Sequence, residues 1–258
     1  LASAYSAAKN GAKVILAEDK PRFGGSLLTS DVNIGNESGK EWADKIITEL
    51  KSMPNVVVKN RAQVFGYYDH NMLVMSERLT EHLPKSDKFT PKQKLWYIRA
   101  KEVVISSGSI ERPLVFGNND TPGVLLSSAA KEYMKVYGVL VGKKPIIFTN
   151  NDSAYETAIE FKKNGVDPIV LDSRKELSSD LIKEAKSLGI NIKFEYVVVN
   201  ANGYRKVKSA DIAKISDDKT TLGKIENIAC DCICVSGFWT PTIHLASQSG
   251  GKTKFNEE

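Results

Sequence analysis

The sequence predicts an α/β fold built from two Rossmann-like β-α-β units. Short apolar runs such as residues 13–17 and Pro145–Phe148 alternate with helical segments, and such runs are typical of buried parallel strands. Several of these runs end in acidic or small residues, at the strand ends where open α/β sheets bind ligands. We expect a first unit over residues 1–122, a second over residues 123–258, and small antiparallel meanders beside the two sheets. Further strands are predicted at Val56–Lys59, Ala62–Tyr68, Met72–Arg78 and Asn191–Val199.

Length and composition limit the class of protein. A chain of 258 residues can bury a sizeable core, and 41% hydrophobic with 26% charged residues is typical of a soluble globular protein. The net charge of +5 comes from scattered lysines without an aromatic-interleaved basic stripe, which argues against nucleic-acid binding. No apolar run approaches the about 20 residues of a membrane span, so we expect no membrane partner either.

The stretch from Gly11 to Leu28 carries the main functional signal. Its predicted strand ends in Glu18 and Asp19, and Gly24-Gly25 follows. In a dinucleotide-binding unit, a carboxylate at the tip of the second strand accepts hydrogen bonds from the adenosine ribose, and glycines let the backbone approach the pyrophosphate. The alternative is a strand that simply ends in solvated acids. The interpretation requires a G-x-G-x-x-G turn before the predicted helix at residues 1–10, and we expect a fragment that begins just after this turn.

A second predicted strand end lies near the middle of the chain. The run Glu102–Ile105 is followed by Ser106, Ser107 and Gly108, whose small size would leave room for a ligand across the sheet edge. Arg112 comes shortly afterwards, and its guanidinium is available for a phosphate or for an interdomain ion pair.

The second predicted β-α-β unit has an impaired turn. Its turn, Thr149–Ala154, reads T-x-N-x-x-A where the dinucleotide fingerprint needs G-x-G-x-x-G, so side chains would crowd a pyrophosphate. Asp172 ends the following strand, at the position of a ribose-binding acid. We therefore predict that this unit keeps the Rossmann-like topology without binding a nucleotide.

Two clusters have both a chemical and a structural interpretation. Cys230, Cys232 and Cys234 could form a metal or redox site, but C-x-C-x-C within a predicted strand at residues 228–235 favours buried thiols. We expect no metal site, and a reducing compartment such as the cytoplasm. Asp69 and His70 could form a catalytic dyad, but chain neighbours seldom face each other, so we predict a loop histidine and assign no catalytic residue.

Longer motifs give a family resemblance. The segments ILAEDKPRFGGSLL, ERPLVFGNNDTPGV, IFTNNDSAYETA and VSGFWTPTIHLASQSGGK resemble the alpha subunit of heterotetrameric sarcosine oxidase, and the similarity extends over essentially the whole chain. Alpha-type subunits of amine, opine and proline dehydrogenases share parts of these motifs.

The resemblance implies a three-layer, FAD/NAD(P)-binding fold like that of glutathione or thioredoxin reductase. It also implies a complex with beta, gamma and delta subunits that oxidises sarcosine with oxygen to glycine and hydrogen peroxide, and passes the methyl carbon to tetrahydrofolate. Sarcosine is oxidised at a flavin in the beta subunit of that family. FMN lies at the alpha–beta interface, and the reductase-like part of alpha holds NAD.

The resemblance, together with the strand-end analysis, gives a set of cofactor-binding residues. They are Glu18, Asp19 and Lys20 around the adenosine ribose, Gly25 and Ser26 near the phosphates, Val64 against the adenine, and Ser107 and Gly108 at the strand edge. We predict an NAD-binding module with the amine chemistry in partner subunits. Three alternatives stay open: a stand-alone FAD/NAD(P)H-dependent oxidoreductase, an alpha-type subunit of a related amine, opine or proline dehydrogenase, and a non-enzymatic assembly scaffold that binds an adenine nucleotide. The sequence also leaves open whether the bound nucleotide is NAD, FAD or ATP.

Overall fold

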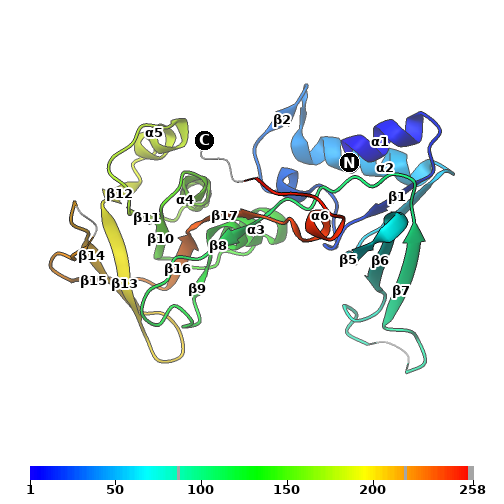
Figure 1. Ribbon diagram of the computed structural model, residues 1–258. Helices are drawn as coiled ribbons and strands as arrows, with labels where there is room; N and C mark the ends of the chain where they lie inside the picture. The colour runs from blue at the N-terminus through cyan, green and yellow to red at the C-terminus, as the bar shows by residue number, and fades with distance from the viewer. Residues whose placement is uncertain (86–87, 218–219, 255–258) are drawn as a thin grey trace. The chain divides into compact units, whose positions relative to one another are not determined.

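The computed structural model describes residues 1–85, 88–217 and 220–254 (Figure 1). These residues group into two units. Unit 1 comprises Leu1–Gly108 and the described residues from Pro241 onward, and unit 2 comprises Ser109–Thr240. The units divide the chain elsewhere than the predicted limits of 1–122 and 123–258. The stretch at residues 109–122 lies in unit 2 because β8 (Ser109–Arg112) pairs with β17 (Phe238–Pro241).

Unit 1 contains a parallel pair of strands packed on two helices. Strand β1 (Val14–Ala17) pairs in parallel with β4 (Val56–Lys59), and one face of the pair packs on α1 (Ala2–Lys9) and α2 (Gly39–Ser52). Helix α2 begins with a capping box. In this box the Ser38 hydroxyl accepts a hydrogen bond from Glu41 N at 3.2 Å, and the Glu41 carboxylate accepts one from Ser38 N at 3.1 Å.

An antiparallel meander completes the regular structure around this pair. It consists of β5 (Ala62–Tyr68), β6 (Met72–Arg78) and β7 (Gln93–Arg99), with a bulge in β5 between Val64 and Gly66. The short turn η2 (Asp69–Asn71) joins β5 to β6, and His70 lies there exposed, as predicted for a loop histidine. Four further short elements are η1 (Gly25–Leu28), β2 (Asn33–Ile34), β3 (Glu37–Ser38) and α6 (His244–Gln248).

The predicted strand at Glu102–Ile105 does not form. Residues 102–108 carry no regular secondary structure, and the Val104 side chain is 69% exposed. A strand needs a hydrogen-bonded partner, and β4 is the only described strand that pairs with β1. The apolar run therefore does not join a sheet, and Ser107 and Gly108 do not follow the carboxyl end of a strand; Gly108 instead directly precedes β8.

Unit 2 is built on a five-stranded sheet in which every neighbouring pair is parallel (Figure 1). The strand order is β12 (Asn191–Phe194), β11 (Ile169–Asp172), β10 (Pro145–Thr149), β16 (Cys232–Ser236) and β9 (Val124–Leu126). Helices α3 (Ser127–Tyr137), α4 (Ser153–Lys163) and α5 (Asp180–Ser187) pack on one face. The meander of β13 (Tyr196–Asn202), β14 (Ser209–Lys214) and β15 (Glu226–Ala229) packs on the other. Unit 2 therefore has the expected three layers.

Two predicted strands are each divided in two. The run at residues 191–199 separates into β12 and β13 because Glu195 takes the left-handed conformation, with φ of 61°. The cysteine run separates into β15 and β16 around Asp231, whose carboxylate accepts hydrogen bonds from Lys143 N and Lys144 N. The chain thereby passes from the meander into the interior of the parallel sheet, between β10 and β9.

The cysteines are buried core residues, as predicted. Cys232 and Cys234 lie in the cluster beneath the helices, and Cys230 lies in the cluster beneath the meander. All three are free thiols, and burial raises the pKa of Cys230 to about 12. No group of His, Cys, Asp or Glu that could hold a metal ion occurs among the described residues. None of the described helices is long and apolar enough to cross a membrane.

Candidate functional site

Glu18 follows the last residue of β1 and is fixed by neighbouring strands. Its N–H donates to the Lys59 carbonyl at 2.9 Å, which extends the parallel pairing by one residue, and its own carbonyl accepts from Ala62 N at 2.8 Å. The carboxylate accepts a hydrogen bond from Lys20 N at 3.1 Å. Glu18 therefore lies at the carboxyl end of a parallel pair, where the sequence predicted a ligand-binding acid.

The environment of Glu18 favours its protonated form. Partial burial, together with a hydrogen bond shared with the Asp19 carboxyl, raises the pKa of Glu18 to about 7. The Lys20 N–H acts in the opposite direction because it stabilises the charged carboxylate. A carboxyl group held at this pKa gains free energy when a ligand donates hydrogen bonds to its ionised form.

Asp19 and Lys20 form a turn that the meander holds. The Asp19 carbonyl accepts from the Arg78 guanidinium at 2.7 Å, and the Lys20 carbonyl accepts from Arg61 N at 3.1 Å. Both residues are exposed. Strand β6 therefore contributes Arg78 to the site, a residue that the strand-end analysis did not single out.

The glycine pair is open on one side. Gly24 and Gly25 have φ of 127° and 54°, which a side chain would strain, and no heavy atom lies within 4 Å of a Cβ built on Gly25. Ser26 lies in η1, and its carbonyl accepts from Ser30 N at 3.0 Å. The Ser30 hydroxyl is buried and has no hydrogen-bond partner among the described residues, so this stretch also holds an unused donor.

The remaining predicted site residues are less suited to their expected roles. Val64 lies half-buried on β5 at the bulge, two residues beyond Ala62. The Ser107 hydroxyl donates to the Thr242 carbonyl at 2.6 Å, and the Gly108 carbonyl accepts from Thr242 N at 2.9 Å. Ser107 and Gly108 are therefore bound to the segment that precedes α6, and the Ser107 hydroxyl proton is already used.

In unit 2, the acid at the corresponding strand end is hydrogen-bonded to other side chains of the same unit. Asp172 is fully buried, and its carboxylate accepts from Tyr155 Oη at 2.8 Å and from two guanidinium nitrogens of Arg174 at 2.8 and 3.0 Å. Arg174 also binds Asp152 at 2.7 Å. These bonds raise the pKa of Arg174, and burial together with the Asp172 charge raises that of Tyr155.

The turn before α4 is likewise filled by side chains. Asn151 Oδ1 accepts from Ser153 N at 3.1 Å, and Trp239 Nε1 donates to Ser153 Oγ at 2.8 Å. An amide side chain thus takes the position at the helix start where a dinucleotide fold places its pyrophosphate. This arrangement is consistent with the predicted lack of a second nucleotide.

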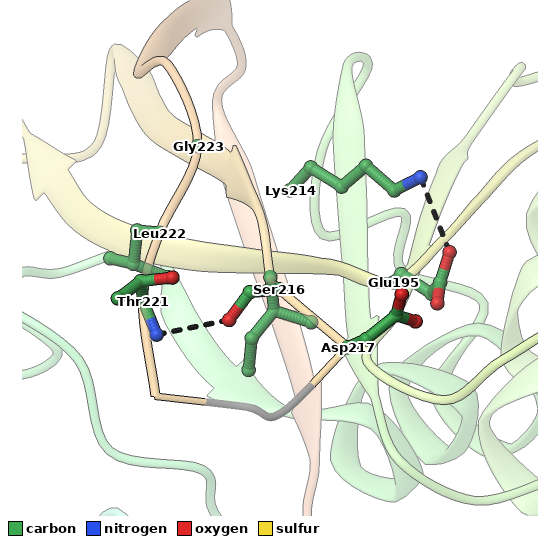
Figure 2. A pocket seen from close by; sticks show the side chains of 8 residues that line it. Glu195, Lys214, Ser216, Asp217, Thr221, Leu222 and Gly223 are labelled. Carbon is green, nitrogen blue, oxygen red and sulfur yellow. Dashed lines mark hydrogen bonds and ion pairs between the residues drawn. The ribbon is translucent and has the colours of Figure 1, made fainter.

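Two surface hollows in unit 2 contain none of the predicted site residues. Figure 2 shows the first, of about 410 Å³, which is lined by Glu195 and by residues 214–217 and 221–223. Its charges are paired, with Lys214 Nζ 3.3 Å from Glu195, and Thr221 N donates to Ser216 Oγ at 3.0 Å (Figure 2). The second, of about 470 Å³, lies on α3 beside Tyr133 and Tyr137.

Comparison with curated proteins gives a consistent answer over the whole chain. It is 36% identical over 259 aligned residues to the sarcosine oxidase subunit alpha of Rhizobium meliloti (strain 1021), covering 100% of this chain. It is 33% identical to that of Corynebacterium sp. (strain U-96), covering 99%. The chain is a relative of the sarcosine oxidase alpha subunit. It spans about a quarter of the length of these relatives, 25% and 27% respectively, and no family model matches it.

Comparison with solved structures shows the fold of this sarcosine oxidase relative. Thioredoxin reductase from T. acidophilum matches with a TM-score of 0.72 and 15% identity, covering 99% of this chain and 78% of that one. L-proline dehydrogenase from P. horikoshii matches with a TM-score of 0.65 and 20% identity, covering 98% and 43%. The expected reductase-like fold is therefore confirmed.

Proposed function

We propose that this chain is the NAD-binding module of the alpha subunit of a multi-subunit sarcosine oxidase. The observation that carries the proposal is the partly buried Glu18 carboxylate, placed after β1 at the end of a parallel strand pair in a reductase-like fold. The identity of 33–36% to sarcosine oxidase alpha subunits supports the assignment to that oxidase.

The described residues suit one adenine dinucleotide. The ionised Glu18 carboxylate would accept hydrogen bonds from the adenosine ribose, and the open side of Gly25 would admit the phosphates near Ser26 and the unpartnered Ser30 hydroxyl. Val64, on the strand that binds the Glu18 carbonyl, would contact the adenine. NAD, when bound, supplies a hydride acceptor, and this chain binds and orients it.

The amine oxidation itself belongs to partner subunits. By this proposal, sarcosine is oxidised at a flavin in the beta subunit, FMN lies at the alpha–beta interface, gamma and delta are further subunits, and the complex works in the cytoplasm. Oxygen is reduced to hydrogen peroxide, and the methyl carbon passes to tetrahydrofolate. The intact protein should therefore copurify with other subunits and form peroxide when sarcosine is added.

The nucleotide content of the intact protein tests the proposal. The protein is purified with the chains that accompany it, denatured, and the released nucleotides are identified by chromatography and mass spectrometry. We expect one NAD per chain and a marked loss of NAD in Glu18→Gln. The matched control is Glu81→Gln, because Glu81 binds Gln93 near the end of β6. A protein without NAD, or one whose NAD content is unchanged by Glu18→Gln, would contradict the proposal.

A second candidate is a stand-alone FAD- and NAD(P)H-dependent oxidoreductase. The likeness of the fold to thioredoxin reductase favours it. It predicts a yellow protein, purified without partners, whose flavin is bleached by NADH. The sequence has no C-x-x-C pair. In unit 2, where a second nucleotide would bind, Asp172 and Ser153 are already hydrogen-bonded to Arg174 and Trp239, so we rank this candidate second.

A further inference from the structure

The turn that carries Glu18 is held through three successive carbonyl oxygens. The three bonds are Ala62 N to Glu18 O at 2.8 Å, the Arg78 guanidinium to Asp19 O at 2.7 Å, and Arg61 N to Lys20 O at 3.1 Å. A peptide plane whose carbonyl is bound cannot rotate freely. The direction in which the Glu18 side chain leaves the backbone is therefore set by these bonds.

Of these three donors, only Arg78 acts through its side chain. It is the last residue of β6, and its own N–H donates to the Arg61 carbonyl at 2.9 Å. The preceding residue, Glu77, is 8% exposed and accepts from Trp96 Nε1 at 2.7 Å and from the Lys59 ammonium at 3.0 Å. The end of β6 is thus fixed, and the guanidinium reaches the Asp19 carbonyl from a rigid base.

We propose that Arg78 is a positioning residue for nucleotide binding, which holds the Asp19 carbonyl and thereby aims the Glu18 carboxylate at the adenosine ribose. This inference rests on the proposed function. Arg78 acts through the turn and does not itself bind the ribose. A guanidinium suits this task because its charged N–H groups form strong hydrogen bonds in a fixed plane.

Paired ligands separate positioning from a general structural role. The dissociation constants of NAD and of its analogue with 2′-deoxyadenosine are measured on the intact protein, with its copurifying chains, after bound nucleotide is removed. The wild type should prefer NAD by about tenfold, as expected for a hydrogen bond to a charged group. Arg78→Met should weaken NAD binding by about tenfold and leave the analogue nearly unchanged, so that the preference disappears. Arg78→Lys should restore part of it.

Two further variants complete the test. Arg78→Met added to Glu18→Gln should cause no additional loss, because residues that act through one another are not additive. Arg99→Met, an exposed arginine on the same meander, should keep the preference for NAD.

Each contrary result has its own meaning. If Arg78→Met weakens both ligands equally, the role is only structural and the inference is overturned. If the two ligands bind Arg78→Met as they bind the wild type, the inference also fails while the proposed function stands. If the wild type binds NAD without preferring it to the analogue, Glu18 does not bind the 2′-hydroxyl of the ribose, and the inference is overturned. If the wild type does not bind NAD, the proposed function fails and the inference with it.

Discussion

The ionisation of Glu18 couples folding stability to pH. The pKa of Glu18 is raised from 4.5 to about 7 in the folded chain, so the folded state binds a proton more tightly than the unfolded state. The resulting stabilisation is present below pH 4.5 and is lost as the pH rises to about 7. The nucleotide-free protein should therefore become less stable over this range.

Above about pH 7 the folded chain holds an ionised, partly buried carboxylate, which costs free energy, and replacing Glu18 with Gln should remove this cost. We expect Glu18→Gln to raise the free energy of unfolding by about 1 kcal/mol at pH 8, a small value because the group is half-exposed to solvent. At pH 4 the variant should gain nothing. Urea denaturation at both pH values measures the difference, with Glu81→Gln as control. An equal gain at both pH values would show that ionisation is not its cause.

The Arg174 guanidinium is the main partner of a fully buried carboxylate. Arg174→Met leaves Asp172 with two neutral partners, the Tyr155 hydroxyl and the backbone N–H of residue 174, and should lower the free energy of unfolding by about 3–5 kcal/mol. Lys175→Met is the control, because its ion pair with Asp217 is exposed to solvent and should contribute little to stability.

A double variant identifies the cause of that loss. Combining Arg174→Met with Asp172→Asn removes the unpaired buried charge and should restore much of the stability, which urea denaturation again measures. An Arg174→Met protein as stable as Lys175→Met would show that Asp172 finds another partner.

At the scale of the element, the start of α2 depends on its capping box. Ser38→Ala removes the acceptor of the Glu41 N–H, and we expect a loss of about 1 kcal/mol in the free energy of unfolding. Ser52→Ala, at the other end of the same helix, is the matched control, because its hydroxyl only supplements the Glu49 carbonyl. Thermal unfolding of both variants gives the comparison, and equal melting temperatures would argue against the cap.

Local patterns predicted most elements, and the failures have physical causes. The strands at Val56–Lys59, Ala62–Tyr68 and Met72–Arg78 were predicted with their observed bounds, because alternation and turn residues are visible in the sequence. Glu195 broke a predicted strand through a left-handed backbone conformation that its residue type does not indicate. The run at residues 102–105 remained unpaired because pairing depends on a partner strand, which a local pattern does not reveal.

In the candidate site too, local signals in the sequence predicted some residues, whereas contacts between distant residues were missed. Glu18 could be predicted because an acid after an apolar strand is a local signal. The hydrogen bond from Arg78 to the Asp19 carbonyl joins residues 59 positions apart, and nothing near Arg78 in the sequence indicates it. Likewise, the binding of Thr242 by Ser107, across 135 positions, could not be foreseen from the small residues around Ser107.

At the scale of the whole molecule, the thiols report global unfolding. Cys232 and Cys234 are fully buried in β16, an interior strand of the unit 2 sheet, and their mutual hydrogen bond together with burial raises the pKa of Cys234. We expect a thiol reagent to modify them only at the rate at which unit 2 unfolds. Their modification rate should rise in parallel with unfolding in denaturant, and fast labelling of the native protein would contradict this.

The position of β16 sets an order of events during synthesis. This strand lies between β10 and β9, although residues 127–231 separate it from β9 along the chain. A ribosome must therefore have released nearly all of unit 2 before the middle of its sheet can close. Until then β10 and β9 lack their shared neighbour, and their unpaired edges can pair wrongly with strands of other nascent chains. Chaperone dependence during translation should consequently be greatest in the interval just before Cys232 emerges.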